Sequence, residues 1–441
     1  MKYAFIIFLC ISTIALSAQN WTQVGSDIDG EAAGDFSGQS VSLSSDGSTV
    51  AIGARENDGN GRNAGHVRVY KNISGTWTQQ GADIDGEAAG DQSGRSVSLS
   101  SDGSIVAIGA LNNDGNGIDA GHVRIYKNIS GTWTQQGSDI DGEAAGDWSG
   151  CYVSLSSDGS IVAIGAWNND GNGSNAGHVR IYKNISGTWT QQGSDIDGET
   201  ASDYSGQSVS LSSDGSTVAI GAPYNDGNGK DAGHVRIYKN ISGTWTQQGS
   251  DIDGEAAGDW SGRSVSLSSD GSNVAIGAYL NDGNGSWAGH VRIYKNMSGT
   301  WTQQGADIDG EASDDQSGRF VSLSSDGSIV AIGAFYNDGN GGNAGHVRIF
   351  KNISGTMGDI SNSTKESKFS VYPNPASDEL NIKIESNLLG SQFRIVNTLG
   401  QEVKQGELSN LNSTINVSKL PKGSYTMLIG TENYLHPFLV E

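Results

Sequence analysis

Carboxylates recur at short intervals in the stretch Asp83-Ile-Asp-Gly-Glu-Ala-Ala-Gly-Asp91. The candidate metal ligands are Asp83, Asp85, Glu87 and Asp91, with equivalents in other repeats. They place oxygens at positions 1, 3, 5 and 9, the spacing of a calcium loop. Gly94 stands at position 12, where a calcium loop carries a bidentate Glu. Asp-Gly and Asn-Gly also form ordinary turns, so a calcium site and a set of polar turns are both open interpretations.

Aromatic residues form a second group of candidates. A unit of 56 residues occurs six times, starting at Trp21, Trp77, Trp133, Trp189, Trp245 and Trp301, and aromatic residues stand where the six copies differ. The candidate ligand-binding residues are Phe36, Trp148, Tyr152, Trp167, Tyr204, Tyr224, Trp260, Tyr279, Trp287, Phe335 and Tyr336. Drift in loops should give mostly polar residues, whereas rigidly held rings offer a ligand contact area with little entropy loss. We therefore expect a face that binds a glycan or a protein; the alternative is that the rings fill gaps between repeats.

Each repeat contains four stretches that are typical of β-strands. They are 96–100, 104–110, 122–126 and 133–136 in the second copy, and turn residues such as Ser-Asp-Gly bound them. No stretch shows helical periodicity over ten or more residues. Four antiparallel strands per repeat predict one propeller blade, and a blade must stack on its neighbours to bury both faces. This strand order places the loops 83–94 and 111–120 on the same face.

The ends of the array predict a closed ring. The array begins with the strand at Trp21 and ends with the strand from His346 to Phe350, and Met357 stands where a seventh Trp would fall. We expect the N-terminal strand to complete the last blade, which removes an open edge. The fold class predicted is all-β, a six-bladed propeller closed by an N-terminal outer strand. Its repeat units are 21–76, 77–132, 133–188, 189–244, 245–300 and 301–356.

Catalytic residues are not expected. A catalytic site needs a cluster unlike its counterparts in other repeats, but the carboxylates here recur uniformly. One His per repeat lies on the third strand, too far from the axis to converge on one metal. Cys151, the single cysteine after residue 18, is expected to be a tolerated small residue. We expect a binding protein rather than an enzyme; the alternatives are a secreted polysaccharide-active hydrolase and a structural surface-layer component.

The two ends of the chain predict export. Residues 1–18 resemble a signal peptide, with Lys2, an apolar run and small residues before the cleavage point. A polar linker is expected at 357–368, and 369–441 carries short strand patterns typical of a small Ig-like β-sandwich. The net charge of −23 argues against nucleic acid as a partner. We expect a monomer without a transmembrane segment.

Two resemblances follow from these motifs. The copies of Gly-Asp-Gln-Ser-Gly-Arg-Ser-Val-Ser-Leu-Ser (90–100), with Val-Ala-Ile-Gly-Ala and Gly-His-Val-Arg-Ile-Tyr, resemble FG-GAP repeats of integrin α-like propellers over residues 21–356. Integrin propellers have seven blades and carry Asp-x-Asp-x-Asp-Gly between the first two strands, whereas Ser-Ser-Asp-Gly-Ser stands here.

Residues 369–441 look like a type A sorting domain of the type IX secretion system. The opening motif contains Tyr372, Pro373, Asn374 and Pro375. This resemblance implies that the type IX machinery is a partner. It also implies that the protein is secreted by a Gram-negative bacterium or attached to the outer surface of the cell.

Overall fold

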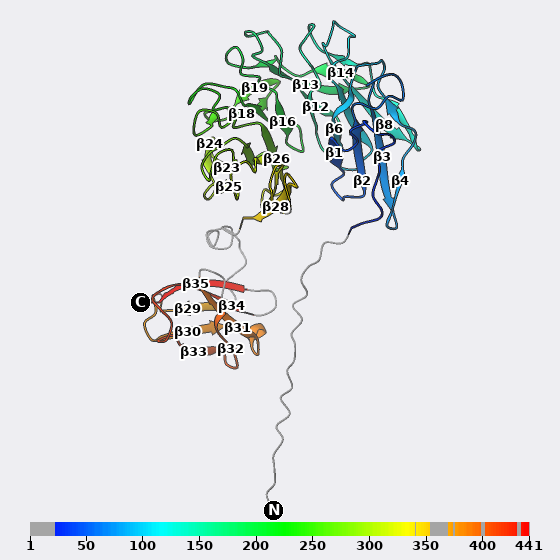
Figure 1. Cartoon of the computed structure of the whole chain (residues 1–441). Helices are drawn as coiled ribbons and strands as arrows, with labels where there is room; N and C mark the ends of the chain where they lie inside the picture. Colours follow the sequence, from blue (N-terminus) through cyan, green and yellow to red (C-terminus); the bar gives the residue numbers. More distant parts are fainter. Residues whose placement is uncertain are drawn as a thin grey trace, which may run out of the picture. The chain divides into compact units, whose positions relative to one another are not determined.

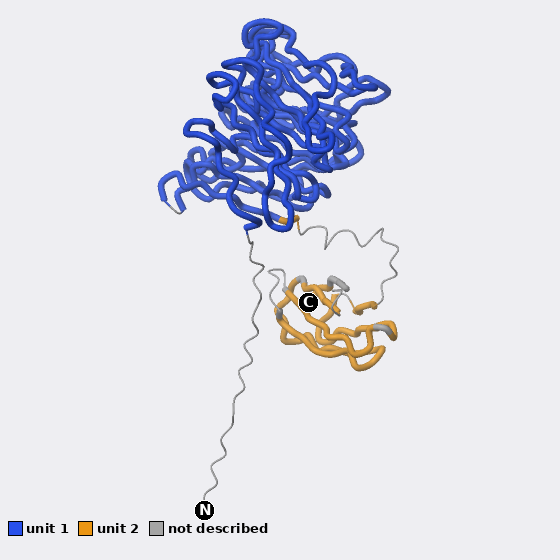
Figure 2. Tube along the Cα trace, turned by 90° about the vertical axis from the view of Figure 1, so that its right-hand side faces the viewer, with its two compact units in different colours: residues 1–350 blue, residues 351–441 orange. Residues whose placement is uncertain are grey.

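The computed structural model describes residues 23–339, 341–352, 369–373, 375–397, 402–429 and 434–440. The chain forms two compact units, residues 1–350 and residues 351–441 (Figure 2). The expected signal peptide (1–18) and linker (357–368) lie outside the described residues. None of the helices in the described ranges is long and apolar enough to cross a membrane.

Each repeat forms one antiparallel sheet, which we call a blade. Blade 1 comprises β1 (Ser40–Leu43), β2 (Thr49–Ala54), β3 (His66–Ile73), β4 (Thr76–Gln79) and β5 (Ile84–Asp85). Blade 2 comprises β6 (Ser93–Leu99), β7 (Ile105–Ala110), β8 (His122–Ile129), β9 (Thr132–Gln135) and β10 (Ile140–Asp141). Blade 3 comprises β11 (Tyr152–Leu155), β12 (Ile161–Ala166), β13 (His178–Ile185), β14 (Thr188–Gln191) and β15 (Ile196–Asp197).

The remaining blades repeat this pattern. Blade 4 comprises β16 (Ser208–Leu211), β17 (Thr217–Ala222), β18 (His234–Ile241), β19 (Thr244–Gln247) and β20 (Ile252–Asp253). Blade 5 comprises β21 (Ser264–Leu267), β22 (Asn273–Ala278), β23 (His290–Met297), β24 (Thr300–Gln303) and β25 (Ile308–Asp309). Blade 6 has three strands among the described residues, β26 (Ser317–Leu323), β27 (Ile329–Ala334) and β28 (His346–Lys351).

The fourth strand of a blade is interrupted, which the sequence pattern did not reveal. In blade 2, β9 pairs with the end of β8 from Tyr126 to Ile129, and β10 pairs with its start at His122 and Val123. Residues 136–139 bulge out between the two pairings because Gly137 adopts a left-handed backbone with φ 78°. The bulge brings Asp139 beside the first residue of β8.

The hydrophobic cores lie between blades, not within them. The core between blades 1 and 2 contains Val67 and Val69 from one sheet and Val106 and Ile108 from the next. Side chains alternate along a strand, so each sheet offers one apolar face to each neighbour. Five such clusters join the six blades in sequence. The blades follow an arc from β1 to β28 (Figure 1).

Backbone contacts make these interfaces close. A Cβ atom on Gly109 would overlap the carbonyl oxygen of Gly150 in the next blade, so only glycine fits there. The Ser-Asp-Gly hairpins, which connect the first two strands of each blade, are hydrogen-bonded to one another. The Ser101 amide donates to the Ser157 carbonyl at 2.8 Å. That bond recurs between the hairpins of successive blades, so a row of backbone hydrogen bonds connects them.

The expected closure of the ring is not observed in the described part of the chain. Residues 23–28 form no strand, and no described strand pairs with the outer edge of β28. Instead, the segment from Val24 packs on blade 1, where the Trp77 indole donates to the Val24 carbonyl at 2.7 Å. Residues 21 and 22 of the expected strand lie outside the described residues.

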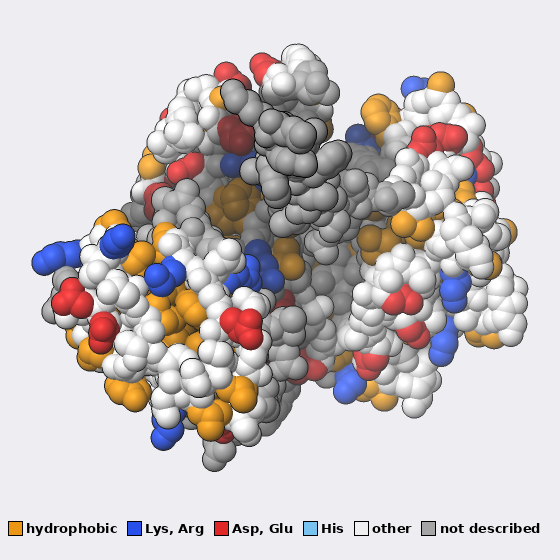
Figure 3. Space-filling model, turned by 90° about the horizontal axis from the view of Figure 1, so that it is seen from below, with side chains coloured by type: hydrophobic (Ala, Val, Ile, Leu, Met, Phe, Trp, Pro, Cys, Tyr) orange, Lys and Arg blue, Asp and Glu red, His pale blue; other side chains and the backbone are white. Residues whose placement is uncertain are grey.

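Both ends of the arc therefore expose an apolar sheet face. Val41 and Leu43 of blade 1 are 62% and 60% exposed, whereas their equivalents Val97 and Leu99 in blade 2 are 8% exposed. At the other end, Ile349 is 58% exposed, whereas its blade 2 equivalent, Ile125, is 2% exposed. Figure 3 shows hydrophobic side chains among the polar and charged ones on the side of the molecule seen from below.

The second unit is a β-sandwich, as expected. One sheet contains β29 (Phe369–Tyr372), β30 (Glu379–Ile384) and β33 (Asn412–Asn416). The other contains β31 (Gln392–Asn397), β32 (Glu402–Glu407), β34 (Gly423–Ile429) and β35 (Tyr434–Val440). A short 3-10 helix, η2, spans Ser386–Leu388. The core between the sheets includes Leu380, Ile382, Ile395, Met427 and Phe438. In the sorting motif Tyr372 is 49% exposed, and Asn374 lies outside the described residues.

Two equivalent glycines test the open arrangement. Gly109→Ala should destabilise the propeller by about 1–3 kcal/mol, because the methyl group overlaps the Gly150 backbone. Gly333→Ala, the same change in blade 6, should be within about 0.5 kcal/mol of the wild type, because the nearest atom to its Cβ is 3.7 Å away. Urea unfolding of both variants measures the difference. Equal losses would show that the blade 6 face is covered in solution.

Candidate functional site

Two sets of loops form one face of the propeller, which we call the loop face. The loop before the first strand of blade 3 meets the loop after the second strand of blade 2, since the Trp148 amide donates to the Asp119 carbonyl at 3.2 Å. Within blade 2, the Asn113 amide group donates to the buried Asp91 carboxylate at 3.1 Å. The expected sharing of a face by these loops is therefore observed.

The variable residue after Gly-Asp (Ser-Asp in blade 4, Asp-Asp in blade 6) has a left-handed backbone in all six repeats. Phe36, Gln92, Trp148, Tyr204, Trp260 and Gln316 have φ values between 52° and 56°. This conformation costs a non-glycine residue roughly 1–2 kcal/mol. Glycine or asparagine would satisfy the turn more cheaply, so the turn alone does not account for the aromatic rings.

Six of the predicted residues form a continuous series of rings across blades 3, 4 and 5. In order they are Trp148, Trp167, Tyr204, Tyr224, Trp260 and Tyr279. Successive ring centroids are 4.4 to 5.6 Å apart, within the range of favourable aromatic pairs. Tyr279 is buried and the other five are half-buried, so the series offers edges and partial faces to a ligand.

The other predicted aromatics lie outside this series. Phe335 and Tyr336 form a pair of their own in blade 6 with centroids 4.7 Å apart. Phe36 lies alone in blade 1, with the Arg55 guanidinium 5.9 Å from its ring centre. Trp287 replaces an Asn or Asp of its sister repeats at a left-handed position, φ 53°, and is 51% exposed.

Tyr152 lies near the axis, at the start of an inner strand. The Arg263 guanidinium of blade 5 donates a hydrogen bond to its hydroxyl at 2.8 Å. Arg95 of blade 2 lies over the same ring, 5.5 Å from its centre. Arg319 of blade 6 lies over Tyr279 at 5.1 Å. Sequence reasoning missed these arginines, although they occupy one position of the repeat that is Gln39, Cys151 or Gln207 elsewhere.

This environment shifts the pKa values of two neighbouring groups in opposite directions. Burial raises the pKa of Tyr152, but Arg263 and Arg95 favour the phenolate more strongly and the net pKa is lowered. Burial raises the pKa of the Cys151 thiol to about 11. Cys151 is 1% exposed and donates to the Gly165 carbonyl at 3.2 Å, which fits the expected packing role.

A Glu, a His and an Asp meet at each of five positions among the described residues. In blade 2 the His122 Nδ1 atom lies 3.9 Å from Glu87 and 3.8 Å from Asp139. Glu87 comes from the loop of the preceding blade, so the triad spans a blade interface. The other triads are Glu31–His66–Asp83, Glu143–His178–Asp195, Glu199–His234–Asp251 and Glu255–His290–Asp307.

The triad histidines are buried, and at His122 and His234 both ring nitrogens lack a hydrogen-bond partner among the described residues, whereas at the other three this holds for Nε2. His122 is 1% exposed, and neither of its ring nitrogens has a partner among the described residues. Burial, reinforced by Arg124, lowers its pKa to about 4, so the imidazole is neutral at pH 7. Two carboxylates and a neutral imidazole are the ligand types of a divalent metal site. The sequence did not predict these triads, because their members are 17 to 52 residues apart.

The structure does not group the four predicted calcium ligands. Asp83 lies beside His66, whereas Glu87 lies beside His122 of the next blade. Asp91 is buried and accepts hydrogen bonds from the Ala88 amide and from Asn113. Asp85 lies in the strand β5 and belongs to none of the possible metal-ligand clusters among the described residues. Asp83 and Glu87 therefore belong to different clusters, and a calcium loop around one ion stays a prediction.

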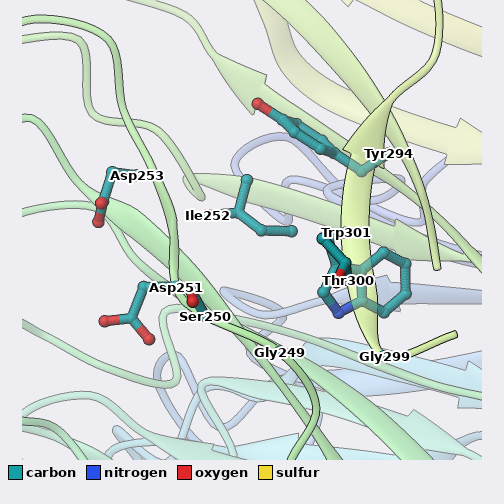
Figure 4. Close-up of a pocket in the computed structure, with 9 residues that line it drawn as sticks. All are labelled: Gly249, Ser250, Asp251, Ile252, Asp253, Tyr294, Gly299, Thr300 and Trp301. Atoms are coloured by element: carbon teal, nitrogen blue, oxygen red, sulfur yellow. The ribbon is translucent and has the colours of Figure 1, made fainter. Parts of the chain in front are cut away.

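A shallow groove recurs along the outer side of the blades. Between blades 4 and 5 it has a volume of ≈ 330 Å³ and is lined by residues 249–253, Tyr294 and 299–301. Ile252 points toward the Tyr294 and Trp301 rings, whereas Asp251 and Asp253 lie on its other side (Figure 4). Equivalent grooves occur at blades 1 and 4, so this feature follows from the repeat and not from a specialised site.

Comparisons with known proteins agree with the two-part organisation. The model of the FG-GAP repeat matches residues 26–70, 189–238 and 245–294. The model of the secretion system C-terminal sorting domain matches residues 370–436. The chain contains FG-GAP repeats and a type IX sorting domain. As a protein with this domain, it is secreted or attached to the cell surface.

Solved structures with a similar fold are distant from this chain. Hydrazine synthase of Kuenenia stuttgartiensis is 15% identical, with 72% of this chain and 78% of that chain covered and a TM-score of 0.46. The periplasmic gluconolactonase PpgL of Pseudomonas aeruginosa is 14% identical, with 86% and 87% covered and a TM-score of 0.46. Saccharomyces cerevisiae Sqt1 is 14% identical, with 92% and 95% covered and a TM-score of 0.42. A search of curated proteins finds no match.

Tyr152 should be the first buried tyrosine of the FG-GAP domain to ionise. The pKa values of Tyr126, Tyr182, Tyr238 and Tyr294 are raised, mainly by burial, whereas that of Tyr152 is lowered. An absorbance titration at alkaline pH should show an early step that Tyr152→Phe removes. Arg263→Gln should move this step to higher pH. A step that is unchanged in both variants would contradict the arginine contact.

Proposed function

We propose that the protein is an exported binding protein whose loop face binds a glycan outside the cell. The observation that carries this proposal is the series of six rings from Trp148 to Tyr279 on a rigid sheet framework. Aromatic rings bind the apolar faces of sugars through contact area and lose little entropy. The left-handed backbone at Trp148, Tyr204 and Trp260 supports a role for the side chains beyond the turn.

Binding without catalysis fits the distribution of polar groups. The carboxylates of the triads recur in each blade instead of forming one asymmetric cluster. Arg55 and Glu56, the unusual charged pair on the loop face, form an ion pair with each other at 3.2 Å. We therefore propose a lectin-like module and not a hydrolase.

A divalent cation at each triad is a second proposal. The buried His122 imidazole has no other partner and faces Glu87 and Asp139. Calcium takes oxygen ligands, whereas an imidazole with two carboxylates suits manganese or zinc. An ion there would link the loop of one blade to the third and fourth strands of the next.

Metal stoichiometry tests the triads. After treatment with a chelator, equilibrium dialysis of the full chain against manganese, zinc or calcium should give five bound ions for one of the three metals. Asp195→Asn should reduce this number by one, because it removes one carboxylate of a single triad. Binding of less than one ion by each metal would overturn the proposal, and so would an unchanged number in the variant.

A glycan array with the full chain tests the loop face. Trp260→Ala should weaken binding to the best glycan by at least about tenfold, because it removes one ring from the middle of the series. Ile185→Ala is the control, since Ile185 is 52% exposed in a hairpin on the opposite face. Equal affinities of the two variants would contradict the assignment. Cleavage of a bound polymer would favour a hydrolase, and no binding at all would favour a structural role.

A further inference from the structure

Three half-buried arginines on the loop face have no carboxylate partner. Arg95, Arg263 and Arg319 form no ion pair with any Asp or Glu among the described residues, in a chain of net charge −23. The arginine of each third strand, in contrast, pairs with a glutamate, as Arg124 does with Glu87 at 3.5 Å. A charged group that is half-buried in an acidic protein and remains unpaired is a candidate for ligand binding.

Arg95 and Arg263 meet at the Tyr152 ring near the axis of the arc, whereas Arg319 lies over the Tyr279 and Phe335 rings. Arg263 belongs to blade 5 and Tyr152 to blade 3, two blades that share no core cluster, yet their side chains are hydrogen-bonded at 2.8 Å. Arg95 of blade 2 and Arg263 lie 5.5 and 5.8 Å from the centre of the Tyr152 ring. Arg319 of blade 6 lies over Tyr279, the last ring of the aromatic series, at 5.1 Å.

Most of the donors on these guanidinium groups remain available. Each group carries five N–H donors. Arg263 uses one of them on Tyr152, and Arg319 makes one long contact of 3.5 Å with Gln316. The Arg95 side chain has no hydrogen-bond acceptor among the described residues.

We infer that this cluster binds the carboxylate of an acidic sugar residue, and that the neighbouring aromatic rings bind the remainder of the glycan. Planar guanidinium groups bind carboxylates through paired, charge-assisted hydrogen bonds. A sulfate or phosphate would satisfy the same donors, but a chain with many charges would be repelled by the net charge of −23. A glycan with a single carboxylate, such as a terminal uronic acid, is attracted by the arginines at short range and is repelled much less by the net charge of the protein.

This inference rests on the proposed glycan binding and narrows it to one class of ligand. The test compares three probes with the same neutral backbone: an oligosaccharide with a terminal uronic acid, its neutral reduced analogue and its sulfated analogue. The full chain should bind the uronic acid form at least tenfold more tightly than the neutral form and more tightly than the sulfated form.

Two arginine variants with the same change of charge complete the test. Arg263→Gln should remove the preference for the acidic probe and leave binding of the neutral probe unchanged. Arg62→Gln, at an exposed position of the loop face, should keep the preference. Equal binding of acidic and neutral probes by the wild type would overturn this inference and leave the proposed function standing. A preference that survives in Arg263→Gln would also overturn it, whereas failure of every glycan to bind would refute the proposed function itself.

Discussion

The contact between neighbouring blades is the constraint on which the rest of the structure depends. No blade has a core of its own, so each sheet is stable only with an apolar face of the next sheet against it. Gly109 and its equivalents allow the backbones to approach closely, and the side chains of Arg124 and Trp133 donate to carbonyl groups of the preceding blade. Because this contact is repeated with little change, the loops emerge at regular intervals. A side chain in one blade is thereby brought into contact with a ring from the next.

On the loop face, acidic side chains surround a group of basic side chains near the axis. The Glu–His–Asp triads lie at the third and fourth strands, whereas Arg95 and Arg263 lie at the inner strands. Attraction by these arginines is therefore short in range, since the Debye length at physiological ionic strength is about 8 Å. The proposed ligand therefore carries its charge at one point, and the remainder of its surface would contact the aromatic rings.

Much of the fold could be predicted from the sequence, because both the period of 56 residues and the alternation within strands are local patterns. The aromatic candidates were found because they differ between otherwise similar repeats. The triads and the contact between Tyr152 and Arg263 were missed, because the residues that meet are separated by up to 111 positions. The carboxylates of residues 83–91 are close in sequence, but Asp83 lies beside His66 and Glu87 lies beside His122 of the next blade, which the sequence alone does not reveal. Closure of the ring was expected from a count of strands, and a count does not determine the angle between blades.

The left-handed backbone at Phe36, Gln92 and Trp148 has an evolutionary consequence. The loop sets this backbone conformation, and its cost is similar for most side chains other than glycine, asparagine, aspartate and the β-branched residues. Exchanging one such side chain for another therefore leaves the scaffold almost untouched. The six positions after Gly-Asp and its variants can therefore be exchanged one at a time while the sheets stay the same. Single substitutions at them would change which ligand the surface binds.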